Sequence, residues 1–242
     1  MTDIHIHTGQ FREAFYAPAQ VLETVFQAGV DTAFFSSTTS CREGITYAEV
    51  EKEIGEALRA CPPERARPLL WYIPAYADQG VRVESALASL PYAGLKLHPR
   101  AQCWDLSRTG HLDMLHGLFD YAHRRSLPAL IHTGPDTVDE ARRFEEFFRA
   151  YPRVRFILAH ARPLDQALRL MAKYAHVHCD TAFVPKTHIR RIVQAGFAAR
   201  LLPGSDFPIT HYQAGRRLSL GDQYKRDVAA LREAGELDFK KL

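Results

Sequence analysis

The sequence lacks the features that would tie it to nucleic acid, to a membrane or to disulfide chemistry. Its net charge of +3 is mild and no basic run interleaves with aromatic residues, so nucleic acid is not an expected partner. No apolar run approaches the ~20 residues that span a bilayer, and no basic segment followed by an apolar core opens the chain. The four cysteines are far apart and show no C-x-x-C spacing. We therefore expect a cytoplasmic protein with reduced thiols and no membrane partner.

Linkers, internal repeats, low-complexity segments and a glycine-rich phosphate loop are also absent from the sequence. The length of 242 residues suits one large domain, and the apolar fraction of 46% is normal for a protein with a buried core. We expect a single domain over residues 1–242.

Short apolar runs alternate with longer amphipathic segments along the chain. Strands are predicted at residues 2–8, 31–38, 68–76, 93–99, 128–134, 153–160, 176–182 and 200–206. Helical spacing lies between them, as at residues 17–29, 46–61, 111–125 and 139–151, and Gly29 and Gly196 stand at expected helix ends. Eight strands alternating with helices predict an α/β protein with a parallel sheet, and at this length a single closed (β/α)8 TIM barrel fits best. A doubly wound open sheet is the alternative.

The first predicted strand carries the stretch DIHIHTG, which places Asp3, His5 and His7 on one face and Ile4 and Ile6 on the other. In a parallel barrel the active site lies at the carboxyl ends of the strands. Polar residues stand at that end of six predicted strands: His5 and His7, His98, His132, His160, Asp180 and Asp206. Their spacing along the chain fits a series of βα units.

A single histidine at a strand end is more often a structural residue than a ligand, and this chain has 12 histidines. Several imidazoles and a carboxylate at one rim are different, because each would lose its hydration at a cost unless something binds it. A divalent metal ion is the simplest such partner, since neutral imidazole nitrogen and carboxylate oxygen are good ligands for zinc. The combination predicts a metal site.

Five motifs in this order, DIHIHT, GLKLHP, LIHTG, ILAHAR and GSDFP, resemble the amidohydrolase superfamily. The resemblance is to its TIM-barrel metal-dependent hydrolase branch, which also contains decarboxylases and lactone hydrolases, and it covers roughly residues 3–210. It implies that His5, His7, His132 and Asp206 hold a divalent metal ion, with Zn²⁺ expected and Mn²⁺ or Fe²⁺ as alternatives. It places His160 beside them, as a further ligand or as a group that polarises the substrate. TatD-type nucleases carry GEIGLD where this chain has GLKLHP, which argues against a nuclease.

The resemblance implies a metal-dependent hydrolase that acts on an amide, ester or lactone bond of a small molecule. The metal would lower the pKa of a bound water toward ~7. Asp206 would act as general base and pass the proton to the leaving group, while His160 would stabilise the developing oxyanion.

Substrate-binding residues are predicted next to the metal ligands: Lys96, His98, Arg100 and Asp180. The positive charges of Lys96 and Arg100 suggest a substrate that carries a carboxylate. Lys96 is also the candidate for a carboxylated lysine that bridges two metal ions, but it lies about 6–7 Å deeper along the strand than His98. We expect one metal ion per chain, an unmodified Lys96, and His98 in the substrate pocket.

Two other functions stay open. The first is a lyase, a metal-dependent non-oxidative decarboxylase of an aromatic or unsaturated acid, which would use the same ligands. The second is a non-catalytic metal-binding barrel. A homodimer is expected from the family resemblance alone.

Overall fold

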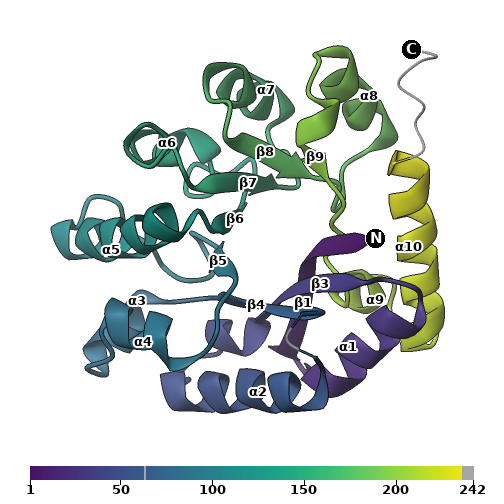
Figure 1. The fold of residues 1–242 in the computed structure, drawn as a ribbon, viewed down its shortest axis with the longest axis horizontal. Coiled ribbons are helices and arrows are strands. Elements are labelled where there is room, and N and C mark those ends of the chain that lie inside the picture. The colour runs from purple at the N-terminus through teal and green to yellow at the C-terminus, as the bar shows by residue number, and fades with distance from the viewer. Residues whose placement is uncertain (63, 236–242) are drawn as a thin grey trace. The chain divides into compact units, whose positions relative to one another are not determined.

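The computed structural model describes residues 1–62 and 64–235. The chain divides into two compact units, which are coloured by residue number in Figure 1. Unit 1 comprises Met1–Leu69 and the chain from Pro203 onward, and unit 2 comprises Leu70–Leu202. In each unit, parallel strands alternate with helices, so the predicted α/β class is confirmed. Within the described ranges, no helix has the length and apolar character needed to cross a membrane.

The sheet of unit 1 is built around β1 (Thr2–Phe11). β1 pairs in parallel with β3 (Thr32–Ser37), which pairs in parallel with β4 (Ala66–Leu70). A hairpin turns β1 back into the short antiparallel strand β2 (Ala14–Tyr16).

The chain after Leu202 returns to β1 and pairs with it. The amide of Ile4 donates to the carbonyl of Pro203 at 2.9 Å, and the amide of Asp206 donates to the carbonyl of His5 at 2.8 Å. The amide of His7 donates to the carbonyl of Phe207 at 2.7 Å. These bonds hold two segments that are about 200 residues apart in the sequence side by side.

Four α-helices cover the strands of unit 1: α1 (Pro18–Gln27), α2 (Tyr47–Ala60), α9 (Ile209–Gln213) and α10 (Leu220–Gly235). A 3₁₀ turn, η1 (Thr38–Cys41), follows β3. Helix α1 begins at Pro18, whose fixed φ suits the first helical position, and buries Val21, Leu22 and Val25 completely. Each such side chain contributes about 1.5–3 kcal/mol of transfer free energy. Helix α2 starts with a capping box formed by Thr46 and Glu49.

Five parallel strands in chain order form the sheet of unit 2: β5 (Gly94–Leu97), β6 (Pro128–His132), β7 (Arg155–Ala159), β8 (Val177–Asp180) and β9 (Leu201–Leu202). Its α-helices are α3 (Pro74–Asp78), α4 (Val83–Ser89), α5 (Thr109–Arg125), α6 (Glu145–Ala150), α7 (Leu164–Lys173) and α8 (Lys186–Gln194). Two 3₁₀ turns, η2 (Ala141–Phe144) and η3 (Ala198–Arg200), complete it. Helices α5 to α8 lie along one side of this sheet (Figure 1), and the ring of Phe156 on β7 packs against Phe119 of α5 and Phe148 of α6.

Each predicted strand overlaps an observed one, but β1 runs three residues beyond its predicted end, and two other extents were wrong. The strand predicted over residues 68–76 ends at Leu70, because Pro74 starts α3 as its first helical residue. The strand predicted over 200–206 is only Leu201–Leu202, since Pro203 has no N–H to donate into a ladder. The hairpin strand β2 was not predicted. Gly29 and Gly196 have φ of +87° and +83° and follow α1 and α8, which confirms both as helix ends.

Candidate metal site and its surroundings

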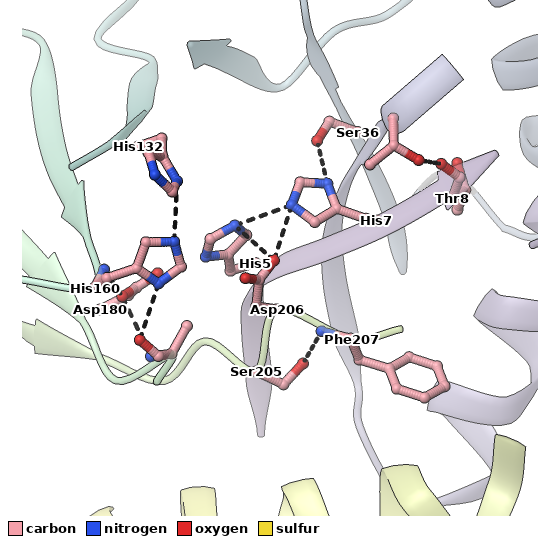
Figure 2. Close-up of polar contacts among 12 residues, drawn as sticks. His5, His7, Thr8, Ser36, His132, His160, Asp180, Ser205, Asp206 and Phe207 are labelled. Atoms are coloured by element: carbon pink, nitrogen blue, oxygen red, sulfur yellow. Dashed lines mark hydrogen bonds and ion pairs between the residues drawn. The ribbon is translucent and has the colours of Figure 1, made fainter. Parts of the chain in front are cut away.

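Three of the predicted metal ligands come together in unit 1. Figure 2 shows His5 and His7 from β1 pointing toward Asp206. The Nε2 atoms of the two histidines are 3.1 Å apart, and Asp206 Oδ1 lies 3.0 Å from His7 Nε2 and 3.4 Å from His5 Nε2. All three side chains are buried, with exposed fractions of 1%, 4% and 6%. The structure therefore gathers three metal-ligating atoms in a buried place.

The geometry of this cluster fits a metal ion. Two ligands of a tetrahedral zinc ion at 2.0–2.1 Å stand about 3.3 Å apart, which is close to the three observed separations. The two imidazole planes meet at 77°, so one ion can lie in the plane of both rings, where their nitrogen lone pairs point.

Ser36 contacts the ring nitrogen of His7 that faces away from the cluster. Its Oγ lies 3.1 Å from His7 Nδ1, and the residue is buried at the end of β3 (Figure 2). When Nδ1–H donates to Ser36, the proton of the neutral ring is on Nδ1 and the Nε2 lone pair faces Asp206 and His5. The contact with Ser36 is thus compatible with the tautomer that a metal ligand needs, and it orients the His7 ring.

Asp3 shares the sequence pattern of His5 and His7, but its carboxyl group accepts hydrogen bonds from the protein itself. Its Oδ1 accepts from the amides of His5 at 3.0 Å and Ser205 at 3.2 Å, and its Oδ2 accepts from the Tyr224 hydroxyl at 2.9 Å. Complete burial raises the pKa of Asp3 to about 7, against the lowering effect of these hydrogen bonds. The carboxyl group ties β1 to the segment that carries Asp206.

A second buried carboxylate supports the chain just after His7. Glu53 of α2 accepts from Thr39 Oγ1 at 2.7 Å and from Thr8 Oγ1 at 3.4 Å, and burial raises its pKa. Thr39 Oγ1 in turn accepts from the amide of Gln10 at 2.8 Å. Gly9 passes through this network with φ of +84°, where a Cβ would lie 2.6 Å from Glu53 Oε1 and closer still to Thr39 Oγ1.

The other predicted site residues lie in unit 2, on its strands or just after them. His160 lies between His132 and Asp180 (Figure 2). His160 Nε2 is 3.1 Å from His132 Nδ1, and Asp180 Oδ1 accepts from the amides of His160 at 2.7 Å and Ala182 at 3.2 Å. Asp180 is fully buried, and these bonds fix the backbone that carries His160.

The tautomer of His160 follows from its contact with a carbonyl. Its Nδ1 lies 3.0 Å from the carbonyl oxygen of Ala182, which can only accept, so Nδ1 carries a proton. A neutral His160 therefore has its lone pair on Nε2 and can ligate a metal ion there. Only the protonated ring could donate from Nε2 to an oxyanion.

A second group of three, His98, His132 and Asp139, has ligand atoms within 4.8 Å of one another but is poorly arranged for a metal ion. The rings of His98 and His132 are stacked, with centroids 3.7 Å apart and planes 10° from parallel. Lone pairs lie in the ring planes, so two nearly parallel stacked rings cannot direct both toward one ion. His98 Nδ1 also lies 3.8 Å from Asp139 Oδ1, near enough for an ion pair when His98 is protonated.

The two cationic residues predicted to bind substrate are both engaged. Lys96 is 2% exposed, and its Nζ lies over the ring of Trp71 at 5.6 Å from the centroid. Arg100 Nη2 pairs with Asp136 at 2.6 Å, its Nε lies 3.7 Å from Asp139 Oδ2, and its amide donates to Asp139 Oδ1 at 3.1 Å.

Sequence reasoning missed residues that act on the predicted ligands through hydrogen bonds. Ser36 lies in the polar run SSTTS that ends a predicted strand, and its place at a strand end was a usable signal. Glu53 and Asp139 both stand in segments predicted as helical, where no periodicity distinguishes them from solvated residues.

Solved structures with the same α/β fold include an amidohydrolase from Burkholderia multivorans with bound zinc, at 16% identity and a TM-score of 0.53, covering 96% of this chain and 94% of that one. A TatD homologue from Escherichia coli K12 is 18% identical with a TM-score of 0.61, covering 100% and 92%. Tryptophan synthase subunit alpha from Legionella pneumophila is 12% identical with a TM-score of 0.56, covering 98% and 92%. At such identities the likeness shows the fold alone.

Among curated proteins, none matches the sequence. The family model for amidohydrolases, in contrast, matches residues 2–233, which is almost the whole described chain and includes every predicted site residue. The chain therefore belongs to the amidohydrolase family.

Proposed function

We propose that the protein is a metal-dependent hydrolase that cleaves an amide, ester or lactone bond in a small, carboxylate-bearing substrate. The observation that carries the proposal is the buried cluster of His5, His7 and Asp206, whose ligand atoms are 3.0–3.4 Å apart. Membership of the amidohydrolase family supports it.

The metal ligands in this proposal are His5, His7 and Asp206, to which the family resemblance adds His132 and His160. Zinc is the proposed ion because the donors are imidazole and carboxylate, and because the Burkholderia structure contains zinc. A single ion per chain and an unmodified Lys96 remain part of the proposal.

A divalent ion held by these residues would lower the pKa of a water molecule and polarise a carbonyl group. The carboxylate of Asp206 would accept the proton of the attacking water and return it to the leaving group. The carbonyl of Ala182 keeps His160 in the required tautomer, and the contact with Ser36 orients His7, so both rings keep their orientation while the proton moves. His98 and Asp180 are proposed to face the substrate and to support His160, respectively.

The alternative is a non-oxidative decarboxylase that uses the same ligands. In a hydrolase, solvent oxygen enters the product, whereas in a decarboxylase carbon dioxide leaves and a proton replaces it. Turnover in ¹⁸O-water with measurement of released carbon dioxide separates the two. A non-catalytic metal-binding barrel would show neither.

The closed (β/α)8 barrel, the single domain and the homodimer expected from the sequence remain proposals. Light scattering coupled to size exclusion would measure the mass in solution, and a mass of one chain would contradict the dimer.

Metal analysis of the double variant His5→Ala/His7→Ala tests the proposed site. We expect the unsubstituted protein to hold one metal equivalent and the double variant to hold none, with the same circular dichroism spectrum. The matched control is His116→Ala/His123→Ala, which removes two histidines from α5 and should leave the metal content unchanged. Equal metal content in the His5/His7 variant and the unsubstituted protein would contradict the proposal.

A further inference from the structure

Arg162 stands out among the charged residues of unit 2, because its guanidinium forms no hydrogen bond or ion pair with the residues that the structure describes. It follows β7, two residues after His160. Its Nε is buried without a hydrogen-bond partner, and in the described part of the chain no residue forms an ion pair with the guanidinium. Buried donors in folded proteins are nearly always bonded, so such an exception needs a physical reason.

The backbone around Arg162 is tightly held in an unusual conformation. His160 and Ala161 both have positive φ, +69° and +47°, which is uncommon for residues other than glycine. The Arg162 amide donates to Thr133 Oγ1 at 3.1 Å, and Thr133 Oγ1 donates to the Ala159 carbonyl. Two consecutive left-handed residues, His160 and Ala161, thus turn the chain immediately before Arg162, and strained backbone of this kind is concentrated at functional sites.

Arg100, the arginine expected to bind the substrate carboxylate, is already engaged by two carboxylates. It pairs with Asp136 at 2.6 Å and holds Asp139 through both its amide and its side chain. Burial raises the pKa of Asp139, and the charge of Arg162 is among the influences that oppose this shift, without an ion pair between the two side chains. Of these two arginines, Arg162 is the one whose donors can meet a new anion.

Phe183 adds an apolar surface beside the same histidine. It follows β8, its ring centroid is 6.0 Å from that of His160, and 39% of the residue is exposed. Its φ is +53°, an outlier for a bulky residue. The turn that imposes this φ is held by bonds from Thr181 to the Leu202 carbonyl and from Val184 to the Thr181 carbonyl. A large flat side chain is therefore kept exposed at a strained position next to a proposed ligand.

We propose that Arg162 binds the carboxylate of the substrate and that Phe183 packs against its body, so that the substrate is a small acid with a flat, unsaturated or aromatic body. The inference rests on the proposed function, because it assigns recognition for the same reaction. A guanidinium presents two parallel N–H donors that match a carboxylate, and an exposed aromatic ring offers a flat face for a planar group.

Titration of the full, metal-loaded chain with benzoate and with benzamide, its uncharged isostere, tests the role of Arg162. We expect the unsubstituted protein to prefer benzoate, and Arg162→Gln to weaken benzoate binding by about 10- to 100-fold while benzamide binding is unchanged. Arg162→Lys should keep part of the preference, because it retains the charge but not the paired donors. Arg190→Gln, which removes an exposed arginine of α8, is the matched control and should bind benzoate normally.

Phe183→Ala tests the second half of the proposal. It should weaken the binding of both benzoate and benzamide by a similar factor and leave the binding of acetate, which has no flat body, unchanged. Equal loss for acetate and benzoate would assign Phe183 a structural role and overturn this half.

Three results would overturn the assignment of Arg162: no preference for benzoate in the unsubstituted protein, a preference that survives in both Arg162 variants, or equal weakening of benzoate and benzamide. Metal analysis of each variant separates this outcome from failure of the proposed function. A chain that holds no metal would contradict the hydrolase proposal, whereas benzoate preference lost in a variant that keeps its metal reports on Arg162 itself.

Discussion

His7 is held through both of its ring nitrogens. Its Nε2 faces Asp206 at 3.0 Å, while its Nδ1 meets Ser36 at 3.1 Å. Because a neutral imidazole has one N–H and one lone pair, the partner of Nδ1 decides what Nε2 can do. The hydroxyl of Ser36 is thus a positioning group that acts through His7.

Replacing Ser36 by alanine should therefore weaken metal binding without unfolding the protein. Loss of a hydrogen bond to a ligating histidine typically reduces metal affinity by about 10–100-fold. Competition titration with a zinc chelator measures the change. Ser89→Ala, which removes a hydroxyl at the end of α4, is the control and should have unchanged affinity. Equal affinity in the two variants would show that Ser36 does not set the His7 tautomer.

Gly9 permits the close approach of β1 to the buried network of Glu53, Ser37 and Thr39. A Cβ at this position would lie 2.6 Å from both Glu53 Oε1 and Ser37 Oγ, which real Cβ atoms do not do. Gly9→Ala should therefore destabilise the protein by more than the ~1 kcal/mol cost of a non-glycine residue at positive φ. Gly80→Ala is the matched control, because Gly80 has φ of +79° but open space around it. Thermal unfolding should show a larger drop for Gly9→Ala, and equal drops would contradict the steric argument.

At the scale of single residues, the ligand cluster of unit 1 could be predicted but its support could not. His5 and His7 stand two apart on a strand, and Asp206 ends another apolar run. The pattern of apolar and polar residues was therefore enough to identify all three. Ser36 and Glu53 act through contacts between β1, β3 and α2, which depend on strand register and helix rotation. Register is set by packing in three dimensions, so the sequence pattern does not contain it.

Among the elements, α9 and α10 are joined by a buried carboxyl group. Asp227 of α10 accepts from Thr210 Oγ1 of α9 at 2.6 Å and from Gln223 Nε2 at 2.9 Å. Burial raises the pKa of Asp227 to about 6, and these two hydrogen bonds only partly oppose the shift. The contact between the two helices therefore depends on protonation.

A raised pKa means that the folded state binds the proton more tightly than the unfolded state. The contribution of Asp227 to the free energy of unfolding is therefore most favourable at pH values below 3.8, the ordinary pKa of an aspartate. It declines as pH rises to about 6 and is constant above that pH. Urea unfolding across this window should show that Asp227→Asn gains stability relative to the unsubstituted protein as pH rises. Asp113→Asn, at an exposed position on α5, is the control for the loss of an acidic side chain. A flat difference for Asp227→Asn would contradict the raised pKa.

The element order was largely predictable because most strands and helices have their own period, while their ends were set by single residues. Pro74 turned the end of one predicted strand into the start of α3, and Pro203 stopped another. The hairpin of β1 and β2 lacks the Asn-Gly or Asp-Gly signal of short hairpins, having Arg12 and Glu13 at its turn, and was missed for that reason.

For the molecule as a whole, the ligands of unit 1 join strand β1 to the segment 203–207. An ion bound to His5, His7 and Asp206 would therefore link two parts of the sequence in the folded state only. Ligands that bind only the folded state stabilise it by mass action, by about 2.7 kcal/mol at a free concentration of 100 times Kd.

Chelation of the metal should accordingly lower the melting temperature by roughly 5–10 °C for a protein of this size. Addition of zinc should restore it. The His5→Ala/His7→Ala variant should melt at one temperature with or without chelator. A chelator-sensitive melting temperature in that variant would place the stabilising ion elsewhere in the chain.

The pairing of β1 with residues 203–207 also has a consequence during synthesis of the protein. His5 and His7 are synthesised about 200 residues before Asp206. At translation rates of 5–20 residues per second, the carboxylate that completes the cluster is synthesised about 10–40 s after the two histidines. Closing a loop of this length is also slow relative to local folding. Metal capture by the three residues together is therefore a late event that follows translation of the segment carrying Asp206, however early β1 leaves the ribosome.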